Sequence, residues 1–197
     1  MLMQRAVGPQ GRPLKTGQVT QYGGYNDDGL LRRGVARGPY TILSAGQYAG
    51  TTNITLNAKT DVHSNNCVFD ESTGLMWSRY ESASVGPASD GRLPWTTTGA
   101  GATAEGIFAF ADAANLAGLA GHNDWRVSNL LELVALMVWE APSIAPDPVA
   151  FPVYGNNVWT STTRPSLITA AFWISSSQIA QNAKTGNGFC LLVRGGV

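Results

Sequence analysis

Charge and cysteine are both scarce in this sequence, and each shortage excludes a class of protein. Only 13% of the 197 residues are charged, and the 13 basic side chains balance the 13 acidic ones. Beyond Arg32-Arg33 the chain has no basic cluster, and non-specific nucleic-acid binding needs a basic footprint. Two cysteines, Cys67 and Cys190, are too few for a disulfide scaffold and are not spaced for zinc. We therefore expect no nucleic-acid partner and no zinc site, while the two thiols are either buried and free or joined in one bridge.

Long apolar segments are also missing. The longest, Leu130 to Trp139, contains Glu132 and is shorter than the roughly 20 residues that span a bilayer, so we expect no membrane insertion. Residues Met1–Arg5 lack the apolar core of a secretory signal, and no signal peptide is visible. The hydrophobic fraction of 44% is nevertheless sufficient for the core of one domain.

Motifs of the common catalytic and metal centres are absent as well. There is no His-Glu-x-x-His, no Cys-x-x-Cys, no phosphate-binding Gly-Lys loop and no dinucleotide fingerprint. His122 and Asp124 could act as a base and its orienting carboxylate, but no nucleophile signature accompanies them. A turn or surface residue is the better interpretation. We therefore predict a protein that is not an enzyme and that has no cofactor and no metal site.

The chain falls into two parts. Residues 1–38 are rich in Gly, Gln, Arg and Tyr and carry too little periodic apolar surface to become ordered by themselves. We interpret them as an extended N-terminal arm, or assembly segment, that another surface must order. Residues 39–197 carry the apolar periodicity of one domain. The 23 Gly and 10 Pro of the chain indicate many turns and few long helices.

The domain is predicted to contain strands, then two helices, then strands. A first helix is expected to open at Thr103–Glu105 and to end before Gly118; a second, N-capped by Ser128, is expected over Asn129–Trp139. Residues 82–101 are expected to be loop. This order predicts an α+β fold. The predicted strands are residues 40–43, 53–57, 66–70, 75–77, 157–161, 171–175 and 188–194.

Tryptophans stand at the edges of the predicted strands and turns. We interpret Trp77, Trp125, Trp159 and Trp173 as large hydrophobic anchors of a loop-rich domain. Trp95 and Trp139, which stand in or near loops, are left unassigned.

Polar side chains crowd the segment 156–187. Short polar side chains beside aromatic rings suit a recognition surface, because they adapt their hydrogen bonds while the rings supply contact area. An ordinary solvated loop has the same composition, so composition alone leaves both interpretations open. The candidate ligand-binding residues are Asn156, Asn157, Arg164, Ser175, Ser177, Gln178, Asn182, Lys184 and Asn187.

Five motifs, in order along the chain, resemble those of the Lcl C-terminal domain family. Residues 68–77, VFDESTGLMW, resemble its V-x-D-x-x-T-G-L-M-W opening, and residues 121–129, GHNDWRVSN, resemble its G-x-x-D-W-R-L-P-N motif. Residues 158–163, 171–174 and 192–196 are similar to its Y-W-S-S-T, A-W-x-V and C-V-R-G-G segments. The resemblance implies a C-type-lectin-like fold, with two helices packed on a twisted antiparallel sheet.

The resemblance also bears on the cysteines and on calcium. In this fold the first and last strands run side by side, which would bring Cys67 and Cys190 within reach of a disulfide. The stretch 41–66 is longer than the usual lead-in of the family and would be an extra hairpin or an oligomer contact. The Glu-Pro-Asn and Gln-Pro-Asp motifs of calcium-dependent lectins are absent, so we expect no calcium-mediated sugar site.

The resemblance implies a non-enzymatic recognition module, related to phage fibre tips, adhesins and the variable proteins of diversity-generating systems. Such a module would be displayed on a virion or an extracellular surface and would bind a cell-surface glycan or protein receptor through the loops of residues 156–187. We expect a homo-oligomer, for example a trimer, or a larger assembly. The alternative is a structural assembly protein, a virion decoration or filament subunit, whose arm contacts neighbouring subunits. An enzyme of the related formylglycine-generating fold would need reactive cysteines, and neither cysteine has His or Lys beside it in the sequence.

Overall fold

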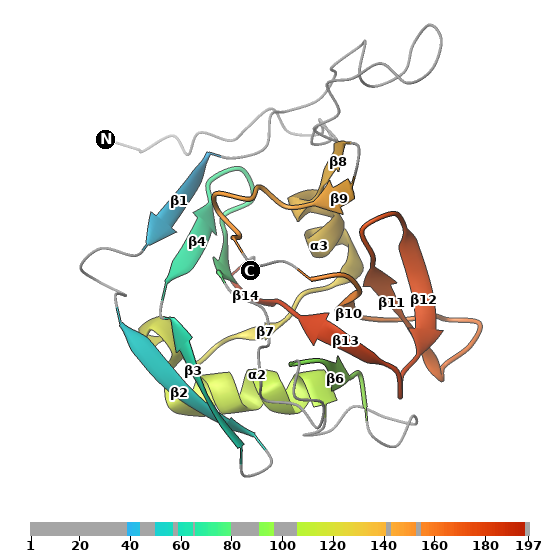
Figure 1. Cartoon of the computed structure of the whole chain (residues 1–197), viewed down its shortest axis with the longest axis horizontal. Coiled ribbons are helices and arrows are strands. Elements are labelled where there is room, and N and C mark those ends of the chain that lie inside the picture. The colour runs from blue at the N-terminus through green and yellow to red at the C-terminus, as the bar shows by residue number, and fades with distance from the viewer. Residues whose placement is uncertain are drawn as a thin grey trace, which may run out of the picture.

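The computed structural model describes residues 39–43, 50–56, 59–64, 66–79, 91–96, 106–140, 143–152 and 155–195. The predicted arm, residues 1–38, lies outside the described residues, as do most of the predicted loop and the expected helix start at Thr103–Glu105. The described part of the chain forms two α-helices and several mainly antiparallel sheets, which confirms the predicted α+β fold (Figure 1).

The strands form two five-stranded sheets and two short hairpins. The first sheet contains β1 (Tyr40–Leu43), β4 (Cys67–Asp70), β5 (Leu75–Ser78), β14 (Leu192–Arg194) and β7 (Arg126–Val127), in that order. The second contains β12 (Ile179–Ala183), β11 (Ala170–Ile174), β10 (Val158–Thr163), β13 (Asn187–Cys190) and β6 (Leu93–Pro94), in that order. The hairpins pair β2 (Thr51–Leu56) with β3 (Lys59–Ser64), and β8 (Val138–Glu140) with β9 (Ser143–Ala145).

The β4–β5 hairpin turns at residues 71–74, as the sequence predicts. Asp70 is 2% exposed, and its carboxylate accepts hydrogen bonds from the backbone and hydroxyl of Ser72 and from the hydroxyl of Thr73. Gly74 has a φ of 73°, which glycine adopts at little cost, and its N–H donates to the carbonyl of Asp70 at 2.8 Å. The turn therefore satisfies a buried carboxylate while it fixes the register of both strands.

The two ends of the domain meet in the first sheet, with one strand between them. Val68 of β4 and Val193 of β14 both pair with Trp77 of β5. The expectation that the first and last strands run side by side is therefore wrong by one strand, because β5 occupies the position between β4 and β14.

The disulfide is not formed. Cys67 and Cys190 are both thiols outside any disulfide, and both are fully buried, so the alternative of two buried thiols is confirmed. Cys67 lies on β4 of the first sheet, whereas Cys190 lies on β13 of the second, where it pairs with Trp159. Both side chains pack into one hydrophobic cluster with Ile107 and Phe110. Burial raises the pKa of the Cys67 thiol to about 12, which keeps it protonated at neutral pH.

Two helices cover separate parts of the core. Helix α2 (Gly106–Ala117) packs with the β2–β3 hairpin, whose Ile54 and Leu56 join its hydrophobic cluster. The hairpin interpretation of the long lead-in is thereby confirmed. Helix α3 (Leu130–Leu136) packs against a second cluster that contains Trp77, Val158 and Ile174.

Helix α3 differs from the prediction at both ends. Its N-cap is Asn129 rather than Ser128, because the Asn129 side chain accepts the N–H of Glu132 while the Glu132 carboxylate accepts the N–H of Asn129. The helix ends at Leu136, and Val138–Glu140 forms strand β8 instead of a last helical turn. Pairing of β8 with β9 overrides the helical periodicity of this segment.

The tryptophan anchors are confirmed. Trp77, Trp125 and Trp159 are at most 3% exposed, and Trp173 packs at half burial against Trp159. Trp95, unassigned from the sequence, is also buried. The Trp95 indole donates to the carbonyl of Thr160 at 2.8 Å and the Trp159 indole to that of Leu93 at 3.1 Å, so the two rings tie β6 to β10 reciprocally.

Candidate functional site

The predicted ligand-binding residues fall at different ends of the second sheet. β10 and β11 are antiparallel, and Val158 pairs with Ile174, so the residues before β10 and those after β11 lie at the same end. Asn156, Asn157 and the turn Ser175–Gln178 share this end, and we call them the strand-end cluster. In Figure 1 the turn is the loop that joins β11 to β12 at the right of the molecule. The backbone N–H of Ile144 in β9 donates to the carbonyl of Ser176 at 2.7 Å, so the β8–β9 hairpin borders the cluster.

Three members of the strand-end cluster present exposed polar side chains: Asn156, Ser177 and Gln178. Within the described residues, the side chains of Asn156 and Gln178 make no hydrogen bond. Ser175 is half-buried, and its hydroxyl donates to the carbonyl of Gln178 at 3.1 Å, which closes the turn. Ser175 therefore maintains the shape of the turn and is not expected to be a main ligand contact.

Asn157 also has a structural task. Its φ is 68°, in the left-handed region, and its carbonyl accepts the N–H of Phe189 at 3.0 Å. Gly188 approaches so closely that a Cβ added to it would lie 2.5 Å from the same carbonyl oxygen. Asn187, which precedes this glycine, is exposed at the start of β13 and pairs with Pro94. Asn187 thus extends the polar surface beside Asn157.

The structure does not bring the other three predicted residues to the strand-end cluster. The N–H groups of Arg164 and Lys184 donate to the carbonyls of Ala170 and Thr169, at the opposite end of β11. Asn182 pairs with Ala171 at that end, and its side-chain oxygen accepts the N–H of Ala183. A ligand centred on the strand-end cluster would not contact these three side chains.

Lys184 was predicted to be a ligand contact on the surface, but it is a core residue. It is only 5% exposed, and its Nζ lies 3.8 Å from the centre of the Trp95 ring. Burial lowers the pKa of its ammonium, since no carboxylate pairs with it among the described residues. The aromatic face supplies the compensating attraction. Trp95 lies 89 positions away in the sequence, which is why composition suggested a solvated lysine.

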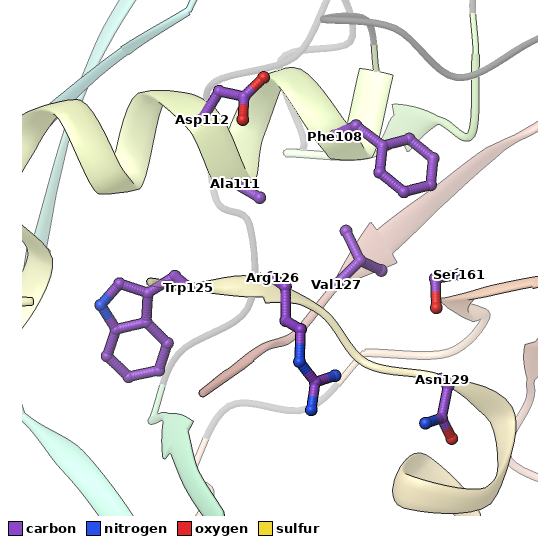
Figure 2. Close-up of a pocket in the computed structure, with 8 residues that line it drawn as sticks. All are labelled: Phe108, Ala111, Asp112, Trp125, Arg126, Val127, Asn129 and Ser161. Carbon is purple, nitrogen blue, oxygen red and sulfur yellow. The ribbon is translucent and has the colours of Figure 1, made fainter. Parts of the chain in front are cut away.

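A second concave site lies between α2, β7, the start of α3 and β10. It is a pocket of about 380 Å³. Figure 2 shows Phe108 and Ala111 directed from α2 toward β7, which carries Val127 below them. Apolar atoms make up most of the lining. The lining residues are Phe108, Ala111, Asp112, Trp125, Arg126, Val127, Asn129 and Ser161.

The charged groups of this pocket differ in their partners. Both terminal guanidinium nitrogens of Arg126 donate to Glu132, at 2.8 and 2.7 Å. Burial alone would raise the pKa of Glu132, but the hydrogen bonds from Arg126 and Asn129 outweigh it and hold that pKa below its ordinary value. Asp112 is exposed at the rim, and its carboxylate makes no hydrogen bond or ion pair among the described residues. The sequence reasoning missed this pocket; its only signal was a lone acid four residues after Phe108 in an alanine-rich helix.

The motif residues 121–132 hold the frame together. The Trp125 indole donates to the carbonyl of Leu119, and Asn115 makes two hydrogen bonds to the Trp125 backbone. Both carboxylate oxygens of Asp124 accept from Arg194 on β14, at 2.6 and 3.1 Å. The hydrogen bond from Arg194 is the main reason that the pKa of Asp124 lies below its usual value. Asp124 therefore links the motif to β14, the last strand of the domain.

The same motifs identify the family. The family model described as the Lcl C-terminal domain matches residues 66–194. The chain belongs to the Lcl C-terminal domain family. Comparison with curated proteins and with solved structures found no match. The matched range begins just before β4 and ends with β14, so the Lcl C-terminal domain contains both large sheets except β1.

No group of three or more His, Cys, Asp or Glu side chains in the described ranges could hold a metal ion. No helix of the described part is long and apolar enough to cross a bilayer. The candidate sites are therefore the strand-end cluster with Asn187, and the pocket beside α2.

Proposed function

We propose that this Lcl C-terminal domain is a non-enzymatic recognition module with a C-type-lectin-like fold, displayed on a virion or an extracellular surface. It binds a glycan or protein receptor through the strand-end cluster and Asn187. The observation that carries this proposal is the exposure of four uncharged polar side chains, Asn156, Ser177, Gln178 and Asn187, around the buried ends of β10 and β11. Function on loops held by a rigid scaffold is common, because loop side chains can change without loss of the core.

The scaffold under the cluster supports the proposal. Val158 and Ile174, the paired residues next to the cluster, are fully buried. The Trp159–Trp173 contact, with ring centres 4.9 Å apart, stiffens the same two strands. The backbone on such a base loses little conformational freedom on binding, and the exposed amides and hydroxyls match the hydroxyls of a sugar or the backbone of a protein loop.

A glycan array and a protein display library, both probed with the full chain, test the proposal. We expect defined hits that the triple variant N156A/S177A/Q178A loses at least tenfold in affinity. The matched control T169A/Q181A/T185A replaces three exposed polar residues elsewhere on the sheet and should keep the hits. Absence of hits in both screens would contradict a recognition module, and equal loss in the control would contradict the location.

The assembly function is a second candidate because of one exposed apolar pair. Leu167 and Ile168 adjoin each other in the β10–β11 loop and are 46% and 70% exposed. Light scattering of the full chain should show a homo-oligomer that L167S/I168S dissociates. A monomeric wild-type chain would contradict this candidate without affecting the recognition proposal.

A further inference from the structure

We infer that the pocket beside α2 is a docking site for a basic side chain from residues 1–38 of this protein. The pocket would hold the aliphatic stem of an arginine or lysine on its apolar lining, with the cationic group on the carboxylate of Asp112. This inference does not rest on the recognition function, and it concerns a different surface.

The pocket matches the shape of such a side chain. Phe108, Ala111, Trp125 and Val127 line it with apolar atoms, and Asp112 stands exposed at its rim. Long basic side chains bury their methylene stems on apolar surface while the charged head stays near water. A cation beside Phe108 would also gain from the ring face. A small apolar pocket with one carboxylate at its mouth therefore suits an alkyl cation better than an anion or a neutral apolar group.

Arg126 does not neutralise the site. Its guanidinium donates twice to Glu132 and once to the carbonyl of Gly195, at 3.2 Å. Burial alone would lower the pKa of Arg126, but its hydrogen bonding to Glu132 is the larger influence and raises that pKa, as expected for a bidentate pair. Figure 2 shows the Arg126 side chain extending away from α2. The free charge of the pocket is thus the negative charge of Asp112.

Residues 1–38 and the rest of the chain carry opposite net charges. Residues 1–38 contain six basic side chains and two acidic ones, a surplus of four positive charges. Residues 39–197 contain seven basic and eleven acidic side chains, a surplus of four negative charges. The neutral total conceals this division. The six candidate occupants are Arg5, Arg12, Lys15, Arg32, Arg33 and Arg37.

The length of the segment permits the contact. A chain of 38 residues can span up to roughly 125 Å, well beyond the width of a domain of this size. The segment can therefore reach the pocket of its own domain or of a neighbouring copy. Dependence of the contact on protein concentration separates these two cases, and both place residues 1–38 in the pocket.

Tryptic cleavage of the native full chain tests the inference, because trypsin cuts after five of the six residues that could dock; Arg12 precedes Pro13 and is not a site. Mass spectrometry would give the cleavage rate after each of the five. We expect D112N to raise the rate at one or more of these five sites by about threefold, the size of one partly exposed ion pair. The matched control is D147N, which also removes one negative charge but keeps the oxygen that accepts the N–H groups of Val149 and Ala150.

The outcomes are decisive in either direction. Faster cleavage in D112N, unchanged cleavage in D147N and equal melting temperatures would support docking at Asp112. Equal cleavage of D112N and wild type at all five sites would overturn it. An equal increase in D147N would also overturn it, because the effect would then come from net charge alone.

Discussion

The β4–β5 and β11–β12 hairpins are both tight antiparallel pairs, and they differ in what surrounds them. In β4–β5 the turn is organised by the buried Asp70 carboxylate, and every residue of β5 is buried. In β11–β12 the turn is closed by the half-buried Ser175, and the residues of β12 alternate between exposed and half-buried. The opening motif of the family, residues 68–77, falls on the first hairpin, where it maintains the frame. The recognition function proposed above places its contacts at the turn of the second hairpin and beside it.

Among the substitutions that test this difference between the two hairpins, replacing Asp70 should have the largest effect on the free energy of unfolding. Asp70→Ala removes the acceptor of three hydrogen bonds in a buried turn, and we expect it to lower the free energy of unfolding by about 3 kcal/mol. Urea denaturation measures this change. Asp70→Asn retains one acceptor oxygen and should lose less. An alanine variant as stable as wild type would show that the first hairpin is no more constrained than the second.

Glu132 tests the frame at the start of α3. It pairs with Arg126 and accepts the N–H of Asn129, so Glu132→Ala should cost about 2 kcal/mol. Glu132→Gln keeps an acceptor for the cap and should cost about half as much. Thermal unfolding of the two variants checks the order. Equal losses would mean that the cap contributes nothing beyond the charge.

Asn157 sharpens the comparison inside the strand-end cluster. Its left-handed φ predicts that Asn157→Ala lowers the free energy of unfolding by about 1 kcal/mol, whereas Asn157→Gly changes it little. Denaturant midpoints of both variants measure the difference. If the alanine and glycine variants are equally stable, the backbone conformation of Asn157 does not contribute to the stability of the scaffold.

The Asp124–Arg194 pair should give a smaller, pH-dependent effect. The folded pKa of Asp124 is depressed, chiefly by its hydrogen bond with Arg194, so the pair stabilises the fold above the ordinary pKa of 3.8 and loses this contribution as pH falls through the folded value. The Asp124 side chain is 52% exposed, and we expect about 0.5 kcal/mol at neutral pH. Asp124→Asn should thus be less stable than wild type at pH 7 and equal to it below pH about 2. A gap that persists in acid would assign the loss to something other than the charge.

The turns and helix starts that depend on residues close together in the sequence were largely predictable. The 66–77 hairpin was predictable because Asp, Thr and Gly stand at the spacing that closes a turn. The start of α3 was missed by one residue, although Glu132 follows Asn129 by three and marks a capping box. Ser128, predicted as the cap, is instead fully buried, and its carbonyl accepts the N–H of Ser161.

Features that depend on distant partners were not predictable. The burial of Lys184 requires Trp95, and the formation of β8 requires β9. Strand β12 was missed because its alternating small and polar residues lack β-branched side chains after Ile179. Of the candidate site, the sequence identified the exposed residues but could not separate them from Arg164, Asn182 and Lys184, because that separation follows from the register of β10, β11 and β12.

Urea denaturation of the quadruple variant N156A/S177A/Q178A/N187A tests most directly whether the frame and the recognition surface are separate. All four side chains are exposed, and the Ser177 hydroxyl makes only a long contact with the turn, at 3.5 Å from the Ser175 hydroxyl. We predict a change of at most about 2 kcal/mol in the free energy of unfolding, because each of the four surface substitutions contributes about 0.5 kcal/mol or less. A loss of about 3 kcal/mol or more would contradict the account, since these residues would then hold the fold as Asp70 does.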